Sequence, residues 1–167
     1  MASVLAGCGG ASVTPPTAPA LPAIALSSSV LPKTHELPKR YACNPKIGVP
    51  PLKWGSLPAK TADLALVVFF VSSAGGTPQL APQAALTGLK PKLHALKAGV
   101  LPKGSVVASD SRVMCPEKGV NATYFVRLYA LKSRIKVPRG ANVTAAVNAI
   151  SGSAVAVGSL EVHYRRA

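Results

Sequence analysis

The longest apolar run of the chain extends from Leu64 to Val71 and is rich in Val and Phe. It is too short to span a membrane as a helix. Its length and β-branched content suit a central β-strand that is buried on both faces. We therefore predict a strand over residues 62–71, followed by a Ser, Gly and Pro loop over residues 72–82, and no transmembrane segment.

Turn-forming residues punctuate the rest of the chain, since there are sixteen prolines and fourteen glycines among 167 residues. Long helices are therefore not expected. Because aromatic residues make up only 5% of a chain that is 49% hydrophobic, the core should consist of Val, Leu, Ile and Ala. Further strands are expected at residues 24–28, around Tyr41, and at 83–89, 105–108, 123–131 and 160–164.

One segment has a helical period. Its apolar residues recur at i, i+3, i+4 and i+7, Asn142 can cap its start and Gly152 can end it. The apolar face comprises Val143, Ala146, Val147 and Ile150. Several strands with one late helix predict a mostly-β, two-sheet sandwich with one or two short helices.

The charge of the chain is strongly positive. Nineteen Lys and Arg face five acids, which gives a net charge of +14. Such a surface attracts polyanions such as anionic lipid or cell-wall polymer, although it can also serve solubility alone. Aromatic residues do not interleave with the basic ones, and no zinc-finger or helix-turn-helix pattern is present, so a nucleic-acid partner is not expected.

The amino-terminal residues 1–22 form a separate segment, before a domain expected over residues 23–167. Leu5-Ala6-Gly7-Cys8 resembles the lipobox of bacterial lipoproteins, and a Pro, Thr and Ala-rich tether follows it. The seven residues before Cys8 are too few for a complete export signal. The match therefore implies a start further upstream, or it is fortuitous. The first reading predicts lipidation at Cys8 and an extracytoplasmic, membrane-anchored domain.

No pattern in the sequence points to catalysis or to a cofactor. The five acids are scattered, and the sequence contains no CxxC, HExxH, GxSxG or P-loop motif. The three histidines, His35, His94 and His163, are far apart in sequence and are expected at the surface. We predict no enzyme activity, no cofactor and no metal site.

A set of motifs in a fixed order resembles the phosphatidylethanolamine-binding-protein-like family, also called Raf-kinase-inhibitor-like proteins. The motifs include the LPKRYAC of 37–43, the PPLKW of 50–54, the LPAKT of 57–61, Cys115-Pro116 and the YFVRLYAL of 124–131. The resemblance covers about residues 24–166. It implies an antiparallel β-sandwich with a small pocket for phosphate-like head groups, in a family that also includes regulators of kinases and peptidases.

The positions that would form this pocket depart from the family pattern. Phe69 and Phe70 begin the segment where the family has Asp-Pro-Asp, and Gln83-Ala84 replaces its His-Trp pair. Ala122 replaces its second histidine, and Val113-Met114 replaces its Gly-Pro, whereas Cys115, Pro116 and Tyr124 match. Phe, Gln and Ala cannot orient a phosphate by charged hydrogen bonds, so the anion site is expected to be lost or changed. Arg112 and Lys118 could still attract an anion to its rim.

Two cysteines lie in the expected domain. In an exported protein Cys43 and Cys115 could pair, and closing the loop between them would stabilise the fold by roughly 4 kcal/mol. The alternative is two buried free thiols.

The sequence thus predicts a non-enzymatic binding module, surface-tethered, for an unidentified small ligand or protein. The alternatives are an electrostatic binder of anionic lipid or wall polymer and, by family analogy, a peptidase or kinase inhibitor.

Overall fold

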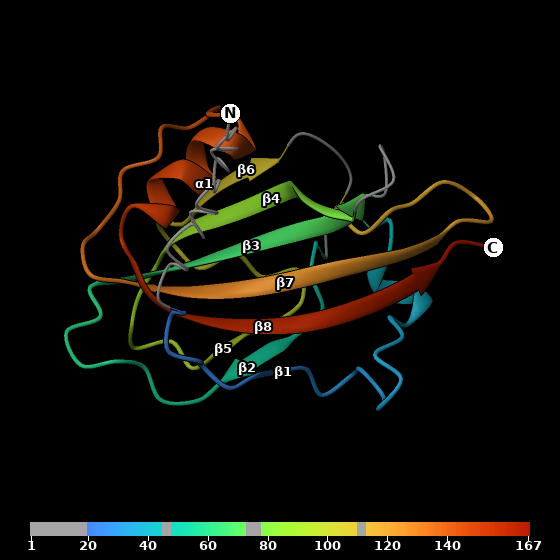
Figure 1. Cartoon of the computed structure of the whole chain (residues 1–167), viewed down its shortest axis with the longest axis horizontal. Helices are drawn as coiled ribbons and strands as arrows, with labels where there is room; N and C mark the ends of the chain where they lie inside the picture. Colours follow the sequence, from blue (N-terminus) through green and yellow to red (C-terminus); the bar gives the residue numbers. More distant parts are fainter. Residues whose placement is uncertain (1–19, 45–47, 73–77, 110–112) are drawn as a thin grey trace, which may run out of the picture.

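The computed structural model describes residues 20–44, 48–72, 78–109 and 113–167. Two antiparallel sheets, one α-helix and one short 3-10 helix account for the regular structure of these residues (Figure 1). The larger sheet has the strand order β6-β4-β3-β7-β8 and the smaller one the order β1-β2-β5. The elements are β1 (Leu26–Ser27), the 3-10 helix η1 (Lys39–Tyr41), β2 (Leu52–Trp54), β3 (Asp63–Ser72), β4 (Gln79–Leu89), β5 (Ala95–Leu96), β6 (Val106–Ser109), β7 (Asn121–Leu131), α1 (Val143–Ser151) and β8 (Ala154–Arg165). The predicted mostly-β two-sheet sandwich is confirmed.

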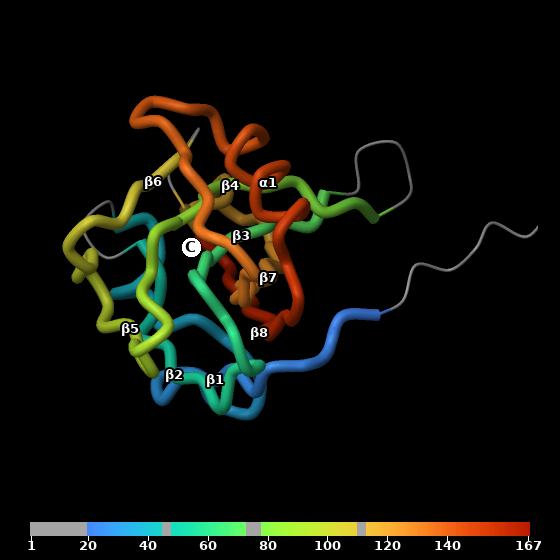
Figure 2. Tube along the Cα trace, turned by 90° about the vertical axis from the view of Figure 1, so that its left-hand side faces the viewer, coloured from blue at the N-terminus to red at the C-terminus, as the bar shows by residue number. Residues whose placement is uncertain are grey.

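The large sheet is covered on both faces. Figure 2 shows α1 on one side of it and β1, β2 and β5 on the other. Because side chains alternate along a strand, Leu64, Leu66 and Val68 of β3 pack into the space between the sheets, whereas Ala65 and Val67 pack beneath α1. The central strand is therefore buried on both faces, which explains its unbroken apolar sequence.

The helix α1 forms at the segment whose apolar residues have a helical period. Asn142 accepts a hydrogen bond from the Ala145 N–H through Oδ1 at 2.8 Å, and Gly152 is the residue at which the helix ends. Val143, Ala146 and Ile150 are buried against the sheet. No helix among the described residues is long and apolar enough to cross a membrane.

Several boundaries differ from the sequence expectation. Residues 39–41 form a 3-10 turn rather than a strand, because the Tyr41 N–H bonds the Pro38 carbonyl. The loop expected over 72–82 ends earlier, since β4 begins at Gln79, and β8 begins at Ala154 rather than 160. Strands β2 and β5 were not predicted, since two or three residues carry too little periodicity to be recognised.

A β-bulge lies near the middle of β4. Val68 pairs with Ala84 but the next residue, Phe69, pairs with Pro82, so Gln83 is left opposite no partner on β3. Proline cannot donate to a ladder and is tolerated in strands at such irregularities. Because of the bulge, the direction of the Gln83 side chain does not follow from the regular alternation of side chains along β4.

The segment before β1 ties the two sheets together. The Pro22 carbonyl accepts from the Val157 N–H, and Ile24 N–H donates to the Val157 carbonyl, both at 3.0 Å. Gly158 allows this approach, because a Cβ there would lie 2.7 Å from the Ile24 carbonyl oxygen. A second bridge joins Glu36 to His163.

Candidate functional site

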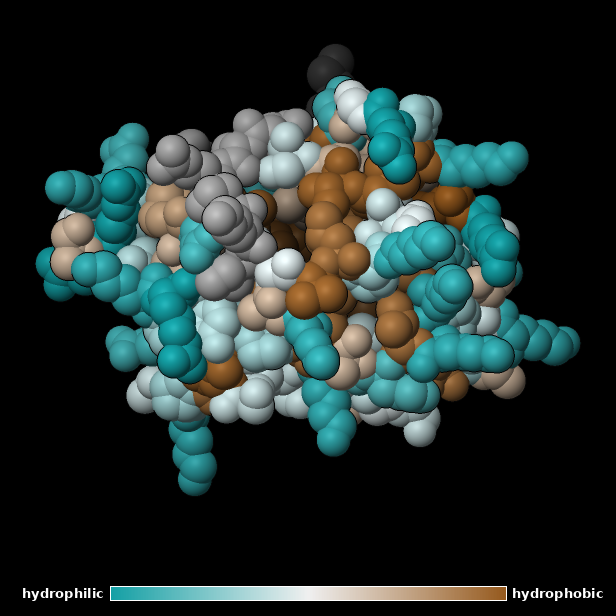
Figure 3. Space-filling view, turned by 180° about the vertical axis from the view of Figure 1, so that it is seen from behind, coloured by the Kyte–Doolittle hydropathy of each residue, from teal (hydrophilic) through white to brown (hydrophobic). Residues whose placement is uncertain are grey.

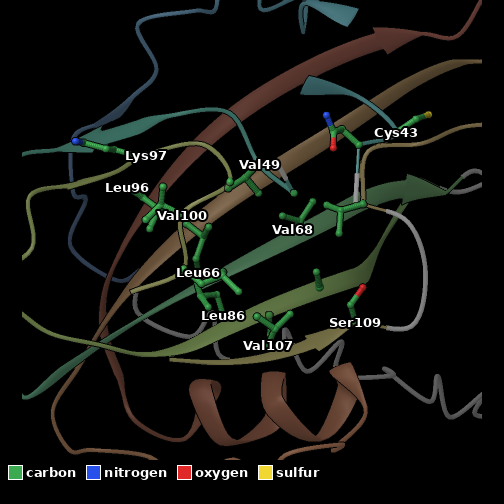
Figure 4. Close-up of a pocket in the computed structure, with 17 residues that line it drawn as sticks. Cys43, Val49, Leu66, Val68, Leu86, Leu96, Lys97, Val100, Val107 and Ser109 are labelled. Atoms are coloured by element: carbon green, nitrogen blue, oxygen red, sulfur yellow. The ribbon is translucent and has the colours of Figure 1, made fainter. Parts of the chain in front are cut away.

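An apolar cavity of about 320 Å³ opens at the β4–β6 end of the space between the sheets. Its floor comes from the inner face of the large sheet. Its opposite wall comes from Cys43, Asn44, Gly48 and Val49 and from the segment between Leu96 and Leu101. Figure 4 shows the side chains of Val49, Leu66, Val68, Leu86, Val100 and Val107 gathered around it, while the ammonium of Lys97 extends away. The volume is at the lower end of the range for small-molecule sites.

The mouth of the cavity is apolar as well. Val100, Leu101 and Val107 line the cavity and are also 55%, 63% and 45% exposed. In Figure 3 hydrophobic side chains gather around a hollow on this face, with hydrophilic ones beside them. Apolar groups at the mouth of an apolar cavity fit an uncharged or chain-like ligand better than an anion.

Two of the sequence-predicted pocket positions, Ala84 and Val113, line this cavity. Ala84 projects from β4 opposite Val68 of β3. Ala84 stands at the position where the family resemblance implies a tryptophan. The cavity therefore adjoins a position at which this chain has a much smaller side chain than the family pattern.

Other residues of the predicted pocket fill a neighbouring region. Phe70 and Tyr124 pack with ring centroids 5.7 Å apart and an interplanar angle of 46°. Gln83 accepts a hydrogen bond from the Met114 N–H through Oε1 at 3.3 Å, and Met114 is fully buried. Phe70, Met114 and Tyr124 belong to one hydrophobic core, and the Gln83 side-chain oxygen is engaged by the Met114 backbone N–H. We call the region around Phe70, Gln83, Met114 and Tyr124 the filled region.

Phe69 does not join this group. It packs on the opposite face of the sheet, beneath α1, where the Arg127 guanidinium lies 5.4 Å from its ring centre. Phe69 was counted among the predicted pocket residues, but of the two phenylalanines only Phe70 lies with them, because adjacent residues of a strand point to opposite faces.

Cys43 and Cys115 form a disulfide, and Cys43 also lines the apolar cavity. The paired alternative is thus the one that the structure adopts. The Pro116 carbonyl accepts a hydrogen bond from Arg166 Nη1 at 3.4 Å, and the same nitrogen lies 4.0 Å from Cys115 Sγ. Lys118 is exposed, whereas Cys8 and Arg112 lie outside the described residues.

A second, polar groove of about 490 Å³ lies where β7 begins and β8 ends. Ala122 lines it, so this member of the predicted pocket is separated from the apolar cavity. The groove combines acidic and basic side chains, including Glu36, Lys39 and Arg165. Such a mixture gives no single charge preference.

The histidines and acids among the described residues offer no metal-binding cluster. No cluster of three or more His, Cys, Asp or Glu suited to a metal occurs there. His163 is not isolated, since its Nε2 lies 3.4 Å from Glu161 and its Nδ1 lies 3.2 Å from Thr123 Oγ1. Burial raises the pKa of Asp63, whose carboxylate accepts from the Leu64 N–H at the start of β3.

Comparison with known proteins connects this architecture to a family. A family model described as phosphatidylethanolamine-binding protein matches residues 27–165. The chain belongs to the phosphatidylethanolamine-binding protein (PEBP) family. A UPF0098 protein of Methanothermobacter thermautotrophicus is 30% identical over 151 residues, which are 80% of this chain and 97% of that protein.

Two solved structures share the PEBP fold. A PEBP homologue of Chlamydia trachomatis superimposes with a TM-score of 0.70 at 22% identity, covering 87% of this chain and 99% of that one. Escherichia coli YbcL, described as a member of the mammalian PEBP family, gives a TM-score of 0.71 at 16% identity, covering 86% and 99%. The family resemblance inferred from the ordered motifs is confirmed.

Most of the apolar cavity was not predicted from the sequence. Its wall residues come from segments far apart in sequence, and no motif among them indicates an apolar binding site. One signal was available, because Gly99-Val100-Leu101-Pro102 places two large apolar residues in a segment with the turn formers of a loop.

Tyr124 provides a test of how dry the filled region is. Its hydroxyl is buried, without a hydrogen-bond partner among the described residues. Burial raises its pKa to about 12, and the nearby Tyr164 adds to the shift. Because the folded pKa exceeds the ordinary value of 10.0, the stability linked to this group is complete below pH 10 and is lost towards pH 12.

We expect Tyr124→Phe to be as stable as the wild type at neutral pH, or more stable by about 1 kcal/mol, since it removes an unpartnered polar group. Its advantage should grow by on the order of 2 kcal/mol between about pH 10 and pH 12. Urea unfolding of both proteins across this range checks the result. A parallel loss of stability in the two proteins would contradict it.

Proposed function

We propose that this chain is a non-enzymatic binding module of the PEBP family that holds an apolar or neutral group in the cavity next to Ala84. The observation that carries the proposal is the cavity itself, which is open, of ligand size and lined mainly by apolar side chains. Burying apolar surface of the ligand there would supply the binding free energy.

The residues at the family's anion position support a change of ligand. A phosphate needs charged or N–H donors to replace its hydration. Phe70 and Tyr124 instead face one another, and the Gln83 side-chain oxygen is engaged by the Met114 N–H. A charged head group would lose its solvation at this position without regaining equivalent hydrogen bonds.

Fluorescence titration of the full chain with the neutral dye N-phenyl-1-naphthylamine tests the proposal. We expect saturable binding of one dye per chain that persists at high salt, because apolar burial is not screened. Phosphoethanolamine should not displace the dye. Binding that vanishes as salt rises would favour the electrostatic alternative, which rests on the net charge of +14.

We further propose that the module acts outside the cytoplasm on a lipid anchor at Cys8. The lipobox-like Leu5-Ala6-Gly7-Cys8 and the tether behind it support this placement. For the test, the chain is expressed in bacterial cells with a complete export signal added upstream. Labelled palmitate should be incorporated into this protein and not into its Cys8→Ser variant. Equal labelling of both forms would exclude this cysteine as the anchor.

A further inference from the structure

The most exposed apolar side chains of this face are neighbours in one loop. Val100 and Leu101 are 55% and 63% exposed, while Val107 on the edge strand β6 is 45% exposed. All three line the mouth of the apolar cavity. We call residues 97–107 the docking loop.

Two turns shape the docking loop. The Val100 N–H donates to the Lys97 carbonyl at 3.2 Å, and Gly99 adopts a φ of 71° that favours glycine. The Ser105 N–H and Oγ both donate to the Pro102 carbonyl, at 3.1 and 2.7 Å. Val100 closes the first turn, and Leu101 lies between it and the second turn, which begins at Pro102.

The charged residues of the docking loop are both basic. Residues 97–107 contain two lysines, Lys97 and Lys103, and no acid. Lys97 and Lys103 are exposed and flank the apolar pair in the sequence. A surface that combines exposed large apolar residues with flanking lysines is complementary to an anionic lipid bilayer, where apolar groups enter the acyl region and ammonium groups meet the phosphates.

We infer that the docking loop places the mouth of the cavity against an anionic phospholipid bilayer, with Val100 and Leu101 inserted and Lys97 and Lys103 at the head groups. This inference rests on the proposed function and deepens it, since an acyl chain could then enter the cavity from the bilayer without crossing water.

Sedimentation with vesicles of phosphatidylcholine and phosphatidylglycerol tests the inference on the full, unlipidated chain. We expect Val100→Ser/Leu101→Ser to lower the vesicle partition coefficient by about tenfold or more. The matched control is Leu80→Ser/Val120→Ser, which removes two exposed apolar side chains, 38% and 41% exposed, that do not line the cavity. The control should bind vesicles like the wild type.

Three results would overturn the inference. One is equal binding by the Val100→Ser/Leu101→Ser variant, with all binding lost at high salt, which assigns the interaction to net charge. Another is an equal loss of vesicle binding in the Val100→Ser/Leu101→Ser variant and in the control variant. The third is a wild-type dimer that this variant dissociates and that does not bind vesicles, because a second copy would then be the occupant.

Dye binding without vesicles separates this inference from the proposed function. Wild-type protein that binds the neutral dye but not vesicles overturns the docking inference and leaves the proposed function in place. Vesicle binding that depends on Val100 and Leu101 but occurs without dye binding supports docking and overturns the proposed cavity ligand.

Discussion

Replacing Cys43 and Cys115 together by alanine is expected to lower the free energy of unfolding by about 4 kcal/mol. The disulfide joins residues 72 positions apart, so it removes a large loop entropy from the unfolded chain. The double substitution is preferable to a single one, because it leaves no unpaired partner that could form other disulfides. Urea unfolding of the oxidised wild type and the variant measures the difference.

Cys8→Ala is the matched control, since it removes the third cysteine and leaves the pair intact. Its free energy of unfolding should equal that of the wild type. A loss below about 1 kcal/mol in the double variant would contradict the argument. So would the titration of both domain thiols in unreduced, denatured protein, which would restore the alternative of two free cysteines.

Ala84→Trp should weaken binding of the neutral dye by about thirtyfold or more, equivalent to roughly 2 kcal/mol. The new indole would project from β4 beside Val68 and occupy much of a cavity of about 320 Å³. Filling a cavity usually does not lower stability, so the variant should unfold at a similar or higher urea concentration. Dye titration and urea unfolding of the same preparation check both effects.

Leu80→Trp is the control for this variant. It adds the same side chain to the same strand at a position that is 38% exposed and outside the cavity wall. Its dye affinity should match that of the wild type. Unchanged affinity in Ala84→Trp, with the fold intact, would place the dye elsewhere and contradict the proposed site.

Elements with a long, clear period were predictable from the sequence. The run through Leu66 identified β3, the alternating Leu160, Val162 and Tyr164 identified the end of β8, and the Asn142 cap located α1. The short strands β2 and β5 were not predictable, because their existence depends on partners supplied by distant segments: β2 pairs with both β1 and β5.

The candidate site was only partly predictable, for a related reason. The family resemblance directed attention to Gln83 and Ala84, but their roles depend on the bulge at Gln83, between Pro82 and Ala84, which the sequence pattern does not reveal. The alternation of side chains along β3 places Phe69 and Phe70 on opposite faces of the large sheet. The cavity wall around Val49 and Val100 forms only after the chain folds.

The most direct test of the account maps ligand-induced amide shifts by NMR on the full chain at high salt. Decanol should shift signals of the cavity wall, namely Val68, Ala84, Leu86 and Val107, and phosphoethanolamine should leave the filled region around Phe70, Gln83, Met114 and Tyr124 unchanged. Shifts in that filled region with phosphoethanolamine, and none in the cavity wall with decanol, would show that the chain retains an anion site and would contradict the account.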